Sequence, residues 1–284
     1  MNHEQQVKKQ VQERYTQALQ SGEGCCGTQE TSKGCGGQDS AFFPSDRLVN
    51  AAGYTSDELA RLPKEATINS FGCGNPLAFS GVRAGQTVLD IGSGAGIDCL
   101  IAAQKVGATG KVIGIDMTPA MIAKARENAI KAGGVNIEFR IGDAENMPVD
   151  SGSIDWIISN CVINLSPNKS AVFDEAFRVL KSGGRFSISD MMVQKLPWYL
   201  RRSSRLYTCC VAGAISETSY LDGLRDAGFV DLVVTERILY DGHQILHLLG
   251  EKVLPKWLGA ALRTKIQHKL EGNIWSTKIH GRKP

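Results

Sequence analysis

The sequence predicts a doubly wound α/β fold with a mostly parallel sheet, an N-terminal arm and a smaller C-terminal α+β region. Between residues 86 and 193, apolar strand-like runs alternate with amphipathic helical segments, and the links between them are short. The first strand-like run ends in a glycine-rich turn that leads directly into a helical segment. This alternation is typical of βαβ units, which build parallel sheets with helices on both faces.

The individual elements follow from hydrophobic periodicity and from glycine positions. The expected helices are 4–20, 55–62, 97–107, 118–133, 170–184 and 220–229, and the expected strands are 86–91, 111–117, 137–141, 154–160, 185–192 and 230–240. Residues 21–40 are rich in Gly, Cys and Ser and indicate a loop. We therefore divide the chain into an N-terminal helix and cysteine-rich loop (1–65), a nucleotide-binding core (66–193), and a substrate-covering region with a basic tail (194–284).

Composition narrows the class of protein. The chain has 284 residues, 42% of them hydrophobic, so it is long enough to bury a full core. Its 32 basic and 29 acidic residues nearly balance, which gives no electrostatic reason to expect a nucleic-acid partner. The first residues are polar, and no apolar run approaches the ~20 residues that a membrane span needs. We expect a cytoplasmic monomer without an integral membrane segment.

The turn "DIGSGAG" indicates a cofactor site. Gly92, Gly94 and Gly96 allow a tight turn and close approach of a ligand at a helix N-terminus. Asp116 ends the next strand, where a carboxylate can accept hydrogen bonds from both ribose hydroxyls. Asp90 would repel a phosphate but suits a cationic amino-acid tail, so the pattern favours S-adenosylmethionine over a dinucleotide. The remaining residues expected at the cofactor are Ser93, Met117, Asp143, Ala144 and Asn160. Here the chain resembles the class I S-adenosylmethionine-dependent methyltransferases, which have a Rossmann-like sheet.

Three of the eight cysteines occupy unusual positions. Cys161 follows a buried strand, at the edge where ligands bind in doubly wound sheets. Cys73 lies between two glycines, and Cys210 lies in the segment after the fifth strand, which often covers the substrate. A structural role remains open for each one, but together they suggest a site of three thiolates for a soft Lewis acid. Cys99, by contrast, lies among apolar helix residues and is expected to be a small core residue.

Several segments together resemble the arsenite S-adenosylmethionine methyltransferases. They are "GCGNPLAF", "VLDIGSGAGIDCLIAAQKVG", "SNCVINLSPNK", "EAFRVLKSGGRFSISD" and "CVAGAI". The resemblance implies that Cys73, Cys161 and Cys210 bind arsenic(III), and that thiols near the N-terminus assist, for which Cys25, Cys26 and Cys35 are candidates. The chain departs from the family pattern in the basic segment "VQKLPWYLRRSSRLYTC" and in its C-terminal extension.

The resemblance also implies a chemistry and a set of partners. The substrate would be arsenite or its thiol conjugates, and methylation would serve arsenic biotransformation and detoxification. A three-thiolate site leaves the arsenic lone pair free to attack a methyl group, so that positioning supplies most of the rate and no general base is required. Thioredoxin or glutathione would act as reductant. Two alternatives stay open: a C- or O-methyltransferase of a small apolar acceptor such as a quinone or sterol, and a non-catalytic thiol-based metalloid binder.

Overall fold

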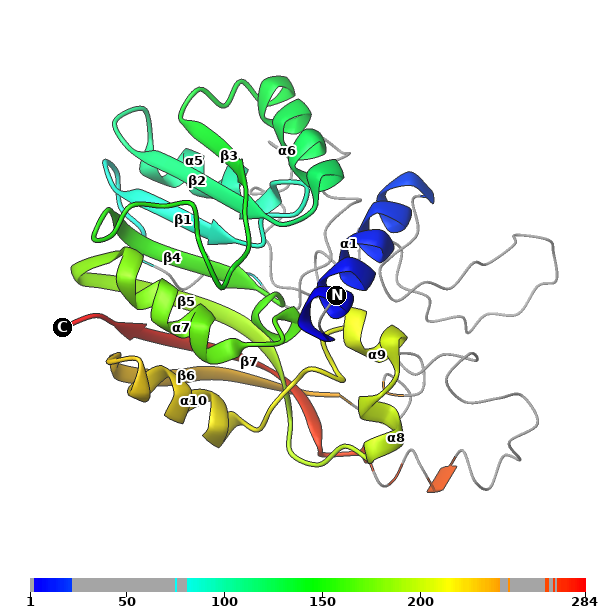
Figure 1. Cartoon of the computed structure of the whole chain (residues 1–284). Helices are drawn as coiled ribbons and strands as arrows, with labels where there is room; N and C mark the ends of the chain where they lie inside the picture. The colour runs from blue at the N-terminus through cyan, green and yellow to red at the C-terminus, as the bar shows by residue number, and fades with distance from the viewer. Residues whose placement is uncertain are drawn as a thin grey trace, which may run out of the picture.

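The computed structural model describes residues 3–21, 75, 81–240, 245, 264, 265, 268 and 270–284. Within these residues the fold is built around a seven-stranded sheet of order β3-β2-β1-β4-β5-β7-β6 (Figure 1). The strands are β1 (Thr87–Ile91), β2 (Lys111–Asp116), β3 (Ile137–Ile141), β4 (Ile154–Asn160), β5 (Leu180–Val193), β6 (Val230–Leu239) and β7 (Ile274–Arg282). Strands β1 to β5 pair in parallel, whereas β7 is antiparallel to both β5 and β6. The predicted doubly wound, mostly parallel sheet is therefore confirmed.

Helices cover both faces of the sheet. Helices α5 (Ile97–Val106) and α6 (Pro119–Lys131) pack on one face, against side chains such as Val88 and Val112. Helices α7 (Lys169–Val179) and α10 (Glu217–Asp226) pack on the other face, against Leu89 and Ile113, the residues that follow Val88 and Val112 in their strands. Successive strand residues are thus buried on opposite faces, which explains the nearly continuous apolar character of the central strands.

The end of the chain is part of the sheet. The sequence indicated a basic tail, but residues 274–282 form β7, which lies between β5 and β6. Ile279 is fully buried there, and the Lys278 ammonium lies 2.6 Å from a Glu236 carboxylate oxygen while its side chain is only 6% exposed. A lysine can bury its aliphatic stem in this way, so a basic segment can still be an internal strand. β5 also begins earlier than predicted, because α7 ends at Val179 and the expected end of that helix, residues 180–184, belongs to the strand.

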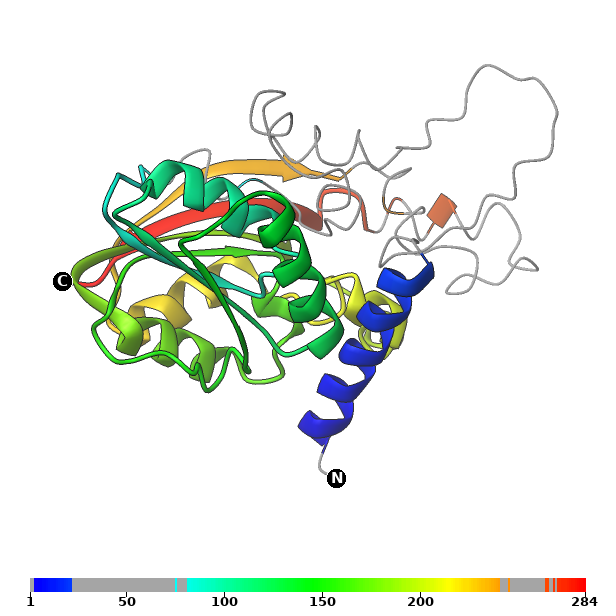
Figure 2. The same ribbon diagram turned by 90° about the horizontal axis from the view of Figure 1, so that it is seen from above.

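Helix α1 (His3–Ser21) confirms the helical prediction for the N-terminal arm and lies beyond the carboxyl ends of the parallel strands (Figures 1 and 2). Its Val11 and Ala18 are buried. Gln12 donates a hydrogen bond to the carbonyl of Met117 (2.7 Å), and the Tyr15 hydroxyl donates a longer one to the carbonyl of Thr208 (3.4 Å). The helix is therefore anchored across the edge where a ligand site is expected.

Short elements connect β4 to α7 and β5 to α10. Residues Ile163–Leu165 form a 3₁₀ turn, η1, and two short helices, α8 (Trp198–Arg201) and α9 (Ser204–Thr208), lead to the Cys209–Cys210 pair. Across the described ranges, no helix combines the length and the apolar character needed to cross a bilayer.

Candidate active site

A cavity that is open to solvent lies at the carboxyl edge of the sheet. Its walls come from the segments that follow β1, β2, β3 and β4, and from one side of α1, which contributes Lys8, Val11 and Tyr15. This is the edge where doubly wound sheets bind ligands.

The glycine-rich turn forms one wall, as the sequence predicts. Gly92 (φ 73°), Gly94 (φ 51°) and Gly96 (φ 90°) all lie in the left-handed region that favours glycine. Among the described residues, a Cβ at Gly94 would meet no atom within 4 Å, and the hydroxyl of Ser93 is buried without a hydrogen-bond partner. A buried hydroxyl without a partner is unfavourable, and a polar ligand group would remove that cost.

Three carboxylates surround this turn. Asp90 is 2% exposed and accepts a hydrogen bond from the Cys99 thiol (3.3 Å). Burial, followed by the nearby negative charges of Asp98 and Asp116, raises the pKa of Asp90 well above its usual value. Burial also raises the pKa of Asp116, although its carboxylate accepts hydrogen bonds from the backbone N–H groups of Gly94 (3.0 Å) and Thr118 (2.7 Å). A cationic ligand group would stabilise all three negative charges.

Asp98 is a cavity residue that the sequence analysis did not single out. It lies in the first turn of α5, it is 4% exposed, and the Asn160 amide donates to its carboxylate (3.3 Å). An acidic residue two positions after the last glycine of the turn could have been recognised in the sequence as a candidate for the same site. Asp90 and Gly96, which were predicted to contact the cofactor, are not among the residues that line the cavity, whereas Gly92, Ser93, Gly94, Asp116, Met117, Ala144 and Asn160 are.

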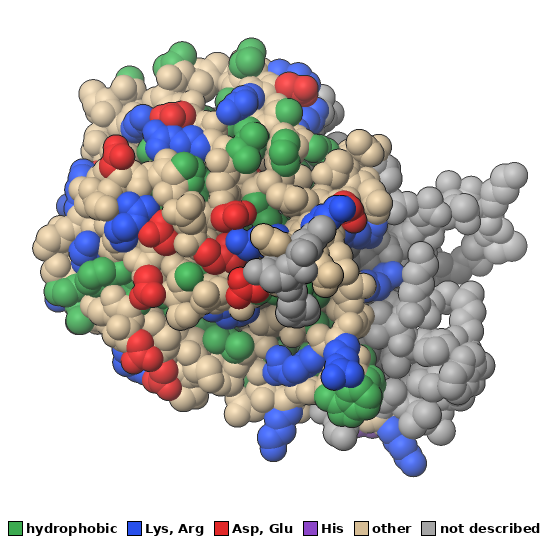
Figure 3. Space-filling model, in the orientation of Figure 1, with side chains coloured by type: hydrophobic (Ala, Val, Ile, Leu, Met, Phe, Trp, Pro, Cys, Tyr) green, Lys and Arg blue, Asp and Glu red, His purple; other side chains and the backbone are tan. Residues whose placement is uncertain are grey.

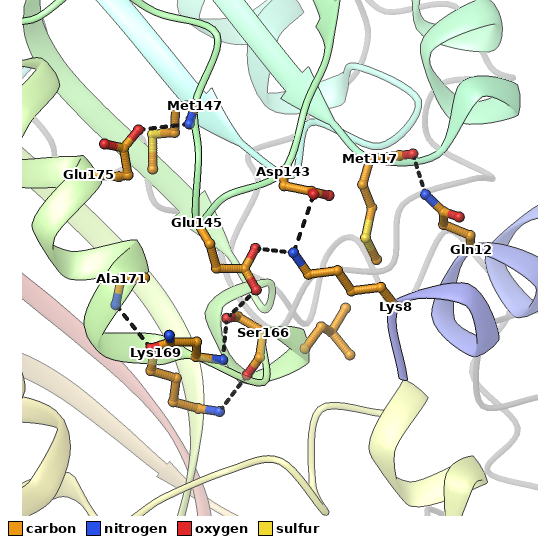
Figure 4. Close-up of polar contacts among 12 residues, drawn as sticks. Lys8, Gln12, Met117, Asp143, Glu145, Met147, Ser166, Lys169, Ala171 and Glu175 are labelled. Carbon is orange, nitrogen blue, oxygen red and sulfur yellow. Dashed lines mark hydrogen bonds and ion pairs between the residues drawn. The ribbon is translucent and has the colours of Figure 1, made fainter. Parts of the chain in front are cut away.

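The predicted adenine-side residue Asp143 is engaged by α1 (Figure 4). The Lys8 ammonium lies 3.2 Å from the Asp143 carboxylate and 3.0 Å from that of Glu145. Glu145 in turn accepts a hydrogen bond from the Ser166 hydroxyl (2.8 Å), in the segment that follows η1. The contact joins α1 to the loops after β3 and β4. Lys8, Glu145 and Ser166 were all missed, because only the fold brings them together.

The fold brings two of the three predicted arsenic ligands together. Cys161 and Cys210 are 2% and 3% exposed, and the Cys210 thiol lies 2.7 Å from the carbonyl oxygen of Cys161. Both residues have left-handed backbone conformations, with φ of 59° and 62°. Cys161 also lines the cavity. It is half of a disulfide whose other half lies outside the described residues, whereas Cys99, Cys209 and Cys210 are not disulfide-bonded.

The structure describes only some of the other cysteines. Cys73, Cys25, Cys26 and Cys35 lie outside the described residues. Cys99 is fully buried in the cluster of α5 and α6, as expected of a core residue, and its thiol hydrogen bond to Asp90 adds a polar role. Within the described ranges, no group of three or more His, Cys, Asp and Glu side chains is arranged to hold a metal ion.

Known proteins resemble this chain in sequence and in structure. Residues 83–250 match the methyltransferase domain family. An arsenite methyltransferase of Halobacterium salinarum is 44% identical over 231 residues (79% of this chain, 58% of the relative), and that of Aquipseudomonas alcaligenes is 40% identical over 203 residues (68% and 58%). The crystal structure of CrArsM, an arsenic(III) S-adenosylmethionine methyltransferase of Chlamydomonas reinhardtii, superposes with a TM-score of 0.63 at 34% identity, covering 83% of this chain and 72% of that one. The predicted resemblance is confirmed, although the chain spans only a little more than half the length of these curated relatives.

Proposed function

Because this chain belongs to the methyltransferase domain family, we propose that it methylates arsenite with S-adenosylmethionine as methyl donor. The observation that carries the proposal is the convergence of Cys161 and Cys210 beside the cavity, with Cys161 lining its wall. Methylation of arsenic would serve its biotransformation and detoxification in the cytoplasm.

The residues of the cavity fit this cofactor. Asp98, backed by Asp90, offers negative charge for an ammonium group, and Asp116 is placed to accept hydrogen bonds from the ribose hydroxyls. The Ser93 hydroxyl, which has no hydrogen-bond partner among the described residues, offers a further polar contact. Gly94 leaves its backbone open to the cavity. Met117 and Ala144 supply apolar walls. When bound, S-adenosylmethionine supplies an electrophilic methyl group on a sulfonium. The protein's task is then to hold the acceptor near that methyl and to exclude water, which α1 does along one wall.

The cysteines suit a soft acceptor. Thiolates are the preferred ligands of soft ions, and trivalent arsenic bound by three of them keeps a lone pair as the nucleophile. In this proposal Cys73, which lies outside the described residues, joins Cys161 and Cys210 as the third ligand. Cys25, Cys26 and Cys35 would assist in substrate capture or in disulfide exchange. Cys161 is in a disulfide, so it must be reduced before it binds arsenic, and thioredoxin or glutathione would supply the electrons.

The test is incubation of the full chain with arsenite, S-adenosylmethionine and a thiol reductant, followed by arsenic speciation and measurement of S-adenosylhomocysteine. Cys73→Ser, Cys161→Ser and Cys210→Ser should each abolish methylation of arsenite. Cys209→Ser is the matched control, because Cys209 is the adjacent free thiol, is 6% exposed, and has no role in the proposal.

Each rival function has its own outcome in this experiment. Arsenite binding without S-adenosylhomocysteine would indicate a metalloid binder. Transfer of the methyl group to a quinone or sterol, unaffected by the cysteine substitutions, would indicate a methyltransferase of apolar acceptors. Either result would exclude arsenite methylation as the function.

A further inference from the structure

A buried carboxylate lies directly beneath the two cysteine loops. Asp190, near the end of β5, is fully buried. One of its oxygens accepts hydrogen bonds from the Asn164 side-chain amide (2.7 Å) and from the backbone N–H of Met191 (2.9 Å). The other accepts from the hydroxyl of Tyr220 on α10 (3.3 Å). Asn164 donates a further hydrogen bond to the carbonyl of Met191 (2.6 Å), so its amide is held against β5 at two points.

Asn164 is also the point where the two cysteine loops meet. It lies in η1, three residues after Cys161. The loop after Cys210 packs on its backbone so closely that a Cβ at Gly213 would lie 2.1 Å from the Asn164 carbonyl oxygen. On either side of this contact, the Tyr207 hydroxyl donates to the Leu165 carbonyl (3.1 Å) and the Cys210 thiol lies against the Cys161 carbonyl. Fixing Asn164 therefore fixes both loops.

Both loops need such fixing, because the left-handed backbones of Cys161 and Cys210 are unfavourable for residues with a Cβ, by about 1–2 kcal/mol each. Strain of this kind persists only where surrounding contacts determine the conformation. Asn164 has an energetic disadvantage of its own, since its side-chain oxygen is buried without a hydrogen-bond partner among the described residues. An unpaired buried acceptor costs about 1–3 kcal/mol. The asparagine therefore does not maximise the stability of the fold, and its role at this position lies in the two hydrogen bonds that its amide group donates.

We propose that Asp190 and Asn164 are positioning residues that hold the Cys161 and Cys210 loops in the geometry that captures the metalloid. The inference rests on the proposed function. Neither side chain would touch arsenic or the methyl donor: Asp190 acts through Asn164, and Asn164 acts through the backbone of the two loops.

The charges around Asp190 support this role. Burial raises the pKa of Asp190 to about 7, while the nearby Lys169 ammonium and the hydrogen bonds from Met191, Asn164 and Tyr220 oppose the rise. Lys169, at the start of α7, donates to the Ser166 carbonyl (3.0 Å) and also interacts electrostatically with Cys210, Arg201 and Glu145. A hydrogen bond to an ionised carboxylate is stronger than one to a neutral acceptor, so the anchor is strongest when Asp190 is charged.

The experiment compares arsenite and cofactor binding in reduced full-length protein, by intrinsic fluorescence and calorimetry. Asn164→Ala should weaken arsenite binding about tenfold, which corresponds to about 1.4 kcal/mol, and should leave S-adenosylmethionine affinity within about twofold. Tyr220→Phe is the matched control: it removes one hydrogen bond from Asp190 but leaves Asn164 anchored, so arsenite affinity should change less than about twofold. If Asn164→Ala does not fold, Asp190→Asn keeps the side-chain shape while removing the charge and should weaken arsenite binding in the same selective way.

Two results would overturn the inference. One is an arsenite affinity within twofold of wild type in the folded variant. The other is an equal loss of affinity for both ligands, which is what a merely structural role predicts. Dibromobimane, which bridges nearby thiols, gives a reading that does not depend on arsenic: bridging of Cys161 to Cys210, identified by mass spectrometry, should slow in Asn164→Ala. Wild-type protein that bridges normally but does not bind arsenite would refute the proposed function while leaving the positioning role supported by slower bridging in the variant.

Discussion

Gly92 provides a sharp test of how the cofactor turn and the cysteine turn fit together. A Cβ built on Gly92 would lie 2.2 and 2.6 Å from the two methyl carbons of Val162 and 2.8 Å from its Cβ. Val162 follows Cys161 directly, so Gly92→Ala forces the cysteine turn to move. The left-handed backbone (φ 73°) adds about 1–2 kcal/mol, and overpacking adds about 1–3 kcal/mol. We expect Gly92→Ala to lower the free energy of unfolding by about 2–5 kcal/mol.

Gly94→Ala separates the two contributions. Gly94 also has a positive φ (51°), but a Cβ there would meet no atom of the described residues within 4 Å, so only the backbone cost of about 1–2 kcal/mol is expected. Urea denaturation of the two variants measures the difference. In a double-mutant cycle, Val162→Ala should recover part of the loss in Gly92→Ala because it removes the two clashing methyl groups. Equal losses in Gly92→Ala and Gly94→Ala, or strict additivity in the cycle, would refute the reasoning.

Three further outcomes are expected. Lys8→Met removes the ion pairs to Asp143 and Glu145 that hold α1 over the cavity, and partly exposed pairs contribute roughly 0.2–1 kcal/mol each. In equilibrium dialysis, S-adenosylmethionine should therefore bind about threefold more weakly to this variant. An unchanged affinity would contradict the role of α1. Ile279→Ala should lower the free energy of unfolding in urea by about 2–5 kcal/mol, since Ile279 is fully buried, whereas a loss below about 0.5 kcal/mol would indicate a surface tail. The pKa of Asp190 is raised from 3.8 to about 7, so the folded state binds the Asp190 proton more tightly than the unfolded state does. The contribution of Asp190 to the free energy of unfolding should therefore fall as pH rises from about 4 to about 7. Asp190→Asn should flatten this slope in urea titrations, and an unaltered slope would contradict the raised pKa of Asp190.

The sequence predicted the sheet well where local pattern and structure coincide. Strands β1, β2 and β4 are mostly buried apolar runs, and β3 alternates apolar and charged residues around a buried Phe139. Each of the four was expected within a residue or two of its observed bounds. β7 was missed because its sequence mixes apolar, hydroxyl and basic residues without a regular alternation, and it is buried by pairing with β6 and with β5, some 90 residues earlier. Pairing between distant segments leaves little trace in the local sequence.

The candidate site shows the same division. Asp116 and the glycine turn are local to one βαβ unit, so their joint meaning could be inferred from spacing. Lys8 was not predicted because its partners lie about 135 residues away, on the loop after β3. The fold brings Cys210 against the Cys161 carbonyl. The left-handed backbones of both residues could not have been foreseen, because a positive φ at a cysteine is imposed by tertiary contacts.

Helix α1 links the two halves of the site physically. Through Lys8 and Gln12 it contacts the cofactor side of the cavity, at Asp143 and at the Met117 carbonyl. Through Tyr15 it contacts the carbonyl of Thr208, two residues before Cys210, and it packs in the same apolar cluster as both cysteines. One helix thus contacts both the wall of the cavity and the segment that precedes Cys210. Weakening the Lys8 contacts should therefore affect both ligands, whereas weakening the Asp190–Asn164 anchor should affect arsenite alone, and this contrast separates closure of the site from the geometry of its thiols.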